Sequence, residues 1–391
     1  MNVRWSTEGV LQVLEDWLLS GLMDRRTFLG VSGIALTGVA WEYLGLEQER
    51  LLAAIEGDET GASLITQLEA TIPALWALDD AHGGVRVLPY VSSQFQTAAY
   101  ILRQGGHNGQ VTRQLFGVVA KLGQHAGWAA FDAGRHGLAQ RYYLTALRAA
   151  HQAADRQLAA HILADLAFQA AATDARQDAG DLAEVAMRAA AVTPARVRAS
   201  VAARAAFAHG AAGDSRRFAI CRHLAHEQLD GSRPQGGDPD WMYYLTPGHV
   251  DALAGPALVR LARTAQARGQ TRHAQTWLRD GLGLLRGSAA LRDTQHPQQR
   301  RAAVEGAWLA LAHALDGDLD QACQVGRLTI SRLGVVQSAR CTSVLTVLRS
   351  ELPADRTSNA DVREFAGELD RALSAPPSRR SHRAPARGPA G

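Results

Sequence analysis

The stretch that decides the fold is QHAGWAAFDAGRHGLAQRYYLTALRAA, residues 124–150. It predicts a helix that contains Gly127 and Trp128, a tight turn at Ala133-Gly134, and a second helix that carries Ala139, Tyr143 and Ala146. Small residues let two helix backbones approach closely, and the larger residue fills the layer between them. The stretch therefore predicts a hairpin of two antiparallel helices.

The same pattern recurs along the chain. The second helices of the later copies carry Ala183-Met187-Ala190, Ala219-His223-His226, Ala274-Leu278-Gly281 and Ala322-Gly326-Thr329. A glycine lies shortly before the alanine in most copies, at Gly134, Gly213, Gly269 and Gly317. One hairpin cannot bury its apolar faces alone, so we expect each to stack on the next. The shortest distance between successive copies is close to the tetratricopeptide unit of about 34 residues, and the distance is greater where loops are longer.

These repeats predict an all-α fold, a tetratricopeptide-like helical-hairpin solenoid over residues 46–352. Residues 1–45 are expected to form an N-terminal helical segment, with Val10, Leu14, Trp17 and Leu18 on one helix face. Pro73 is expected near the start of a helix. A terminal helix is predicted in residues 353–373, and a disordered basic tail in residues 374–391.

Composition agrees with this fold and narrows the function. Hydrophobic residues make up 47% of the chain and aromatic residues 6%, which favours closely packed, Ala-rich helices. The net charge of +3 is small and much of it lies in the tail, so the body lacks the basic stripe of a protein that grips DNA by itself. The 3 cysteines are widely spaced, which favours buried thiols in a reducing compartment, the cytoplasm.

Four stretches carry a resemblance to a known family: AAFDAGRHGLAQRYYLTALRAA (129–150), DPDWMYYLTPGHVDALAGPALVRLAR (238–263), WLALAHALDGDLDQACQV (308–325) and SARCTSVLTVLRSEL (338–352). They resemble actinomycete transcriptional regulators that fuse an N-terminal Xre-type helix-turn-helix domain to a tetratricopeptide region. MDRRTFLGVSGIALTGVA (23–40) is similar to the segment that follows the DNA-binding domain in that family. The resemblance implies regulation and sensing.

The chain departs from that family at its start, because the residues before Arg25 are too few to form a helix-turn-helix domain. Direct DNA binding by this chain is therefore not expected. Two explanations stay open: a paralogue that lost its DNA-binding domain, or a gene start that was set too late.

The segment DRRTFLGVSGIALTGVA, residues 24–40, has a second interpretation as a twin-arginine export signal, with Gly38-Val39-Ala40 as the cleavage site. Export signals are normally poor in acidic residues before the arginines. Here Glu8, Glu15, Asp16 and Asp24 precede Arg25-Arg26. We favour a buried helix of a cytoplasmic protein, and an exported helical-repeat scaffold is the alternative.

The concave face of a solenoid is lined by the first helix of each repeat and is where a ligand or partner is expected. The residues predicted on it are Lys121, Gln124, Trp128, Asp132, His161, Asp165 and Arg263. Converging charged, amide and aromatic groups suit a groove that holds a peptide. Each has a plainer interpretation as a solvated or inter-repeat residue, and Trp128 as a core residue.

The longest insertion, residues 230–249, contains Trp241, Tyr243 and Tyr244. An aromatic stretch in a long loop suits a lid over the groove, and it suits equally well a plug that fills an irregular turn.

Motifs of catalysis are missing from the sequence. His223 and His226 lie one helical turn apart, as two metal ligands would, but no third or fourth ligand accompanies them, so packing histidines are favoured. The sequence predicts no metal site and no cofactor. An enzyme built on His161 and Asp165 is the weakest alternative.

Taken together, the sequence predicts a non-enzymatic, cytoplasmic regulatory protein. It is expected to bind a peptide, a small ligand or a protein partner, and to modulate transcription or development through that partner. No membrane association is expected, and the Ala-rich faces allow a homodimer.

Overall fold

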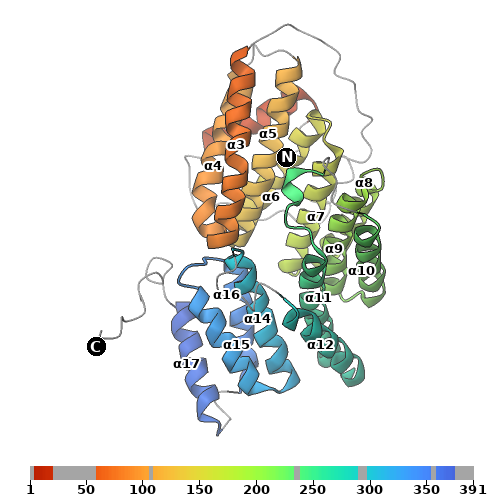
Figure 1. The fold of residues 1–391 in the computed structure, drawn as a ribbon, viewed down its shortest axis with the longest axis vertical. Coiled ribbons are helices and arrows are strands. Elements are labelled where there is room, and N and C mark those ends of the chain that lie inside the picture. Colours follow the sequence, from red (N-terminus) through yellow and green to blue (C-terminus); the bar gives the residue numbers. More distant parts are fainter. Residues whose placement is uncertain are drawn as a thin grey trace, which may run out of the picture.

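The computed structural model of the chain describes residues 4–20, 59–104, 109–232, 238–288, 297–353 and 358–374 (Figure 1). These residues form α-helices and one short 3-10 helix, and they contain no β-strand. The predicted all-α class is therefore confirmed. Arg25-Arg26 and the tail beyond residue 374 lie outside the described residues.

Consecutive helices pair as antiparallel hairpins. The pairs are α3 (Glu59–His82) with α4 (Gly84–Gln104), α5 (Gly109–Asp132) with α6 (His136–Gln152), α7 (Arg156–Ala172) with α8 (Arg176–Ala190), α9 (Ala195–Ala212) with α10 (Ser215–Asp230), α11 (Pro247–Ala267) with α12 (Thr271–Arg286), α14 (Gln299–Asp316) with α15 (Leu319–Arg332), and α16 (Ala339–Glu351) with α17 (Ala360–Ser374). The helix α1 (Thr7–Ser20) lies across α4 and α6, and the 3-10 helix η1 (Asp240–Met242) precedes α11.

The four glycines predicted in the turns lie there. Gly134, Gly213, Gly269 and Gly317 have φ angles between 71° and 87°, a left-handed conformation that costs glycine little. Each ends the first helix of its hairpin. The turn between α7 and α8 has no glycine, and Asp174 adopts the left-handed conformation there, with φ of 59°.

The repeat assignment is wrong in one copy. Ala219 and His223 of α10 are exposed, whereas Phe218, Cys221 and Ala225 are buried. The buried stripe of α10 therefore begins one residue earlier than expected. In so Ala-rich a chain, an alanine at the right interval does not identify the packed face.

Two further expectations concern the first part of the chain. Pro73 lies inside α3 rather than at a helix start. It is exposed, so the carbonyl group that loses its hydrogen bond lies on the solvent side of the helix. Val10 and Leu14 are fully buried on one face of α1, as predicted.

The three cysteines are buried thiols, as predicted from their number and spacing. Among the described helices, none combines the length and the apolar character that a bilayer-spanning segment needs.

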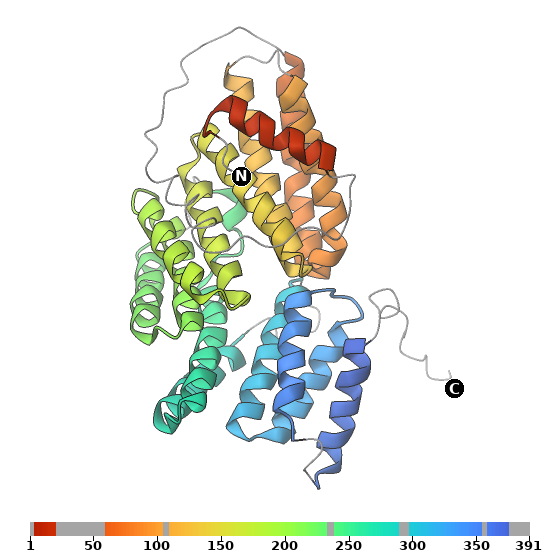
Figure 2. The same ribbon diagram turned by 180° about the vertical axis from the view of Figure 1, so that it is seen from behind.

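The stack of hairpins curls until its end meets its beginning, which both views show (Figures 1 and 2). Helix α14 contacts α3, and α16 contacts α5. The backbone N–H of Gln337 donates to the carbonyl of His82 at 2.9 Å, and the N–H of Val85 donates to the carbonyl of Gln337 at 3.3 Å. These contacts close the curl around the middle of the molecule.

Candidate functional site

A cavity of about 230 Å³ lies where the curl closes, and we call it the central cavity. Its walls come almost entirely from the first helix of each hairpin: α3, α5, α7, α9, α11, α14 and α16. Aromatic side chains form much of its surface: Trp76, Trp128, Phe131, Phe168, Phe207, Trp241, Tyr243, Tyr244 and Trp308. Charged side chains also line it: Asp79, Asp80, Arg204, Arg260, Arg300, Arg301, Glu305 and Arg340.

The first helices differ from ordinary surface helices, because one side packs on the partner helix and the other faces the cavity. In α7 and α9 nearly every residue is buried. A charged residue in such a helix needs a partner inside the protein, because burying an unpaired charge is costly. The charged residues of these helices therefore define the inner site.

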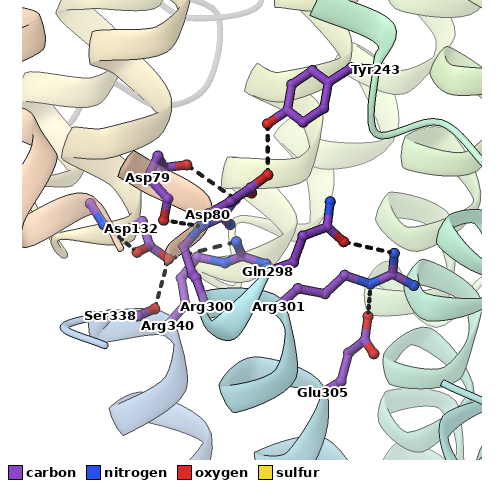
Figure 3. A network of polar contacts seen from close by, with 11 residues as sticks. Asp79, Asp80, Asp132, Tyr243, Gln298, Arg300, Arg301, Glu305, Ser338 and Arg340 are labelled. Carbon is purple, nitrogen blue, oxygen red and sulfur yellow. Dashed lines mark hydrogen bonds and ion pairs between the residues drawn. The ribbon is translucent and has the colours of Figure 1, made fainter. Parts of the chain in front are cut away.

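The first cluster joins α3 to α14 across the closure (Figure 3). The Nη2 atom of Arg300 lies 3.1 Å from Asp79 Oδ2 and 2.9 Å from Asp80 Oδ1. The hydroxyl of Tyr243 donates to Asp80 Oδ2 at 3.0 Å. Burial raises the pKa of Asp79 to about 7, and the carboxylates of Asp132 and Asp80 add to this, although Arg300 opposes it. The cluster is thus close to electrical neutrality near pH 7.

The second cluster lies on α5, α7 and α9. Asp165 is fully buried and accepts hydrogen bonds from Arg204 Nε at 2.8 Å and Gln124 Nε2 at 2.7 Å. His161 lies 3.5 Å from the same carboxylate and stacks on Trp241, with ring centroids 4.4 Å apart. Burial lowers the pKa of His161 to about 4, so its imidazole is neutral at pH 7.

The third cluster lies at the closure between α5 and α16. Asp132 Oδ2 accepts the backbone N–H of Gly84 at 2.8 Å, and Asp132 Oδ1 accepts the hydroxyl of Ser338 at 2.7 Å. Arg340 Nη1 lies 3.7 Å from Asp132 Oδ1, which is too far for a hydrogen bond. The Arg340 guanidinium instead stacks on aromatic rings, at 4.9 Å from the centroid of Trp128.

The aromatic insertion lies against the cavity. Trp241 is buried on His161, while Tyr243 stacks on Trp76 with ring centroids 5.5 Å apart. Tyr244 lies over Arg204, and its hydroxyl is 3.0 Å from that of Ser200. All three predicted lid residues therefore line the central cavity and cover α3, α7 and α9.

The predicted groove residues separate into three groups. Gln124, Trp128 and His161 line the central cavity. Asp132 and Asp165 lie behind its wall and hold lining residues in place. Lys121 and Arg263 lie away from it, in ion pairs with Glu69 at 3.1 Å and Glu351 at 2.8 Å.

Sequence reasoning missed most of the charged lining. Arg204 lies in VAARAAFAHGAA, residues 201–212, and Asp79-Asp80 in WALDDAH, residues 76–82. A charged residue inside an otherwise apolar helix was the available signal. The repeat pattern alone identifies only the small residues at the helix contacts.

The histidine pair of α10 shows no metal-site geometry. His223 is exposed, and His226 Nε2 lies 3.2 Å from Asp251 Oδ1. Within the part of the chain that the structure describes, no group of three or more histidine, cysteine or acidic residues is arranged to hold a metal ion.

Comparison with models of protein families and with curated proteins finds no match to this chain. The central cavity and its three clusters are therefore the basis on which a function can be argued.

Proposed function

We propose that this chain is a non-enzymatic, cytoplasmic regulatory protein of the tetratricopeptide-like solenoid type, which binds a small ligand in its central cavity. The observation that carries the proposal is the cavity itself, which gathers aromatic and charged residues from the first helix of every hairpin. Ligand pockets are concave and mostly apolar, with a few converging polar groups.

The shape of the site favours a small molecule or the end of a peptide over a folded partner, because the cavity lies within the ring of first helices and its polar groups point into it. The walls belong to both ends of the stack. A ligand that contacts both would change how tightly the ends close, and this change could be transmitted to a partner protein.

The resemblance to actinomycete regulators supports a role in transcription or development through such a partner. The reduced, buried cysteines support a cytoplasmic location. The ionisable groups of the cavity are mostly engaged with each other, which favours a binding site over a catalytic one.

The proposal is tested by filling the cavity in cells. Ala252 lines the central cavity, so Ala252→Trp should occupy it. Ala219 is exposed on α10, so Ala219→Trp is the matched control. We expect cells with Ala252→Trp to reproduce the transcript changes of a gene deletion, at equal protein levels, and cells with Ala219→Trp to match the parent. If the deletion changes no transcripts, or if both variants behave as the parent, the proposed function is wrong.

A further inference from the structure

The cations of the central cavity differ in how well they are neutralised. Arg204 is bonded to Asp165, Arg300 to Asp79 and Asp80, and Arg301 to Glu305. Arg260 donates to the carbonyl of Ala171 at 3.0 Å and lies 3.2 Å from Asp174. Each of these guanidinium groups has a hydrogen-bonded acceptor.

Arg340 is the exception. Its nearest carboxylate is Asp132 at 3.7 Å, and no described residue forms a hydrogen bond with its side chain. Both oxygens of Asp132 already accept stronger bonds, from Gly84 and Ser338. The side chain is only 17% exposed, and that exposure lies at the cavity wall. A buried cation without hydrogen bonds is costly, so an anion that enters the cavity gains this interaction.

The surroundings of Arg340 position its guanidinium group. Trp128, Phe131 and Phe168 lie around it, with ring centroids 4.9, 5.3 and 5.2 Å from the guanidinium carbon. Stacked rings leave the edges of the planar group, where its N–H donors point, open to a ligand. The same rings offer an apolar surface beside the anion.

We propose that the central cavity binds a monocarboxylate with an apolar body, and that Arg340 receives the carboxylate. This inference rests on the proposed function and deepens it. One guanidinium group whose N–H donors lack an acceptor suits one carboxylate, whereas a phosphate dianion would need a second such group. The planar guanidinium group matches a carboxylate with two parallel hydrogen bonds. The carboxylate could belong to a small organic acid or to the C-terminus of a short peptide.

A cationic ligand is the main competing assignment, because Asp79 and Asp80 also line the cavity. Both oxygens of Asp80 are already bonded, to Arg300 and Tyr243. Asp79 is paired with Arg300, and its raised pKa reduces the negative charge of the cluster near pH 7. Both oxygens of Asp80 are thus occupied, whereas Asp79 Oδ1 has no hydrogen-bond partner among the described residues, so the ammonium probe below tests this alternative directly.

The test uses the full chain and three probes of one shape: 3-phenylpropionate, 3-phenylpropionamide and 3-phenylpropylammonium. Binding is followed by calorimetry and by tryptophan fluorescence, since Trp76, Trp128, Trp241 and Trp308 line the cavity. We expect the acid to bind about tenfold more tightly than the amide, because a charge-assisted pair is about twice as strong as a neutral one. Arg340→Gln should remove this preference and leave the amide's affinity unchanged.

Two variants serve as controls. Arg340→Lys keeps the charge and should retain a weaker preference for the acid. Arg263→Gln loses the same charge outside the cavity and should bind all probes as the parent does. An N-acetylated dipeptide, Ala-Phe, with a free or an amidated C-terminus distinguishes the two possible sources of the carboxylate, a peptide C-terminus and a small organic acid. Tighter, Arg340-dependent binding of the free dipeptide assigns the ligand to a peptide end, and tighter binding of phenylpropionate assigns it to a small acid.

The inference is overturned if the amide or the ammonium probe binds as well as the acid, if the preference persists in Arg340→Gln, or if no probe binds. Binding of the ammonium probe alone would leave the cavity as a ligand site and reject only the carboxylate. The cavity-filling comparison in cells judges the proposed function independently of these titrations.

Discussion

At the scale of single residues, His125 makes the stability of the fold depend on pH. Its imidazole is buried against the central cavity, and neither ring nitrogen has a hydrogen-bond partner among the described residues. Burial lowers its pKa to about 3, and the positive charge of Arg300 adds to the effect. The unfolded chain binds a proton below about pH 6.5 that the folded chain does not bind. Stability is therefore lost as the pH falls through this range.

His125→Leu removes this loss and breaks no hydrogen bond. The variant's free energy of unfolding, relative to the parent, should rise by up to about 1.4 kcal/mol per pH unit as the pH falls from about 6 to about 4. Urea unfolding of both proteins over this range measures the difference. His161, His249 and Asp79 titrate in both proteins, so their effects cancel. Parallel stability curves for the two proteins would show that His125 does not titrate as inferred.

At the scale of elements, two helical glycines give opposite predictions for the free energy of unfolding. One lies at the close contact between α5 and α6, and the other lies in open space on α12. A Cβ atom on Gly127 would lie 2.6 Å from the ring of Tyr143, whereas one on Gly283 of α12 meets nothing within 4 Å. Gly127→Ala should therefore destabilise the protein by about 1–3 kcal/mol, because the hairpin must open. Gly283→Ala should stabilise it by up to about 1 kcal/mol through helix propensity. Thermal and urea unfolding measure both changes, and the same sign at both sites would contradict this packing.

The elements also show which features the sequence could predict. Gly127, Tyr143 and the turn glycines follow from local geometry, because a helix pair needs a small residue at each close approach and a left-handed residue at the turn. The predicted buried face of α10 is wrong because Ala219 satisfies the same local rule as Ala225. An alanine fits a buried or an exposed position at little cost, so the pattern alone left the helix rotation undetermined.

At the scale of the whole molecule, the curl of the stack was not predictable. It brings Asp79 beside Arg300 and Asp132 beside Ser338, residues about two hundred positions apart. Each hairpin contributes a small rotation to its neighbour, and the sum decides whether the ends meet. No local pattern encodes that sum. The concave residues Gln124, Trp128 and His161 could be named from the repeat, but the cavity that closes over them could not.

Asp132 tests whether the closure is a distinct interface. Asp132→Ala would leave the buried N–H of Gly84 and the hydroxyl of Ser338 without an acceptor, and Arg340 without its nearest carboxylate. Removing one partner from a buried charged group costs about 3–5 kcal/mol. The Ser338 and Arg340 contacts cross the closure, and the Gly84 bond joins the first two hairpins beside it, so the loss is concentrated where the two ends meet. Backbone amides of Val85 and Gln337, which cross the closure, should then exchange with solvent much faster, while the amides of α9 keep their protection.

Asp370→Ala is the matched control, because Asp370 pairs with Arg349 at the surface, at 2.9 Å, and is 54% exposed. Such a pair contributes less than about 1 kcal/mol, so exchange at Val85 and Gln337 should stay as in the parent. Small-angle scattering gives a second readout, since separated ends increase the radius of gyration without loss of helix. Equal acceleration of exchange in every helix would mean that the molecule unfolds as one unit. In that case a ligand in the central cavity could not act by changing the closure alone.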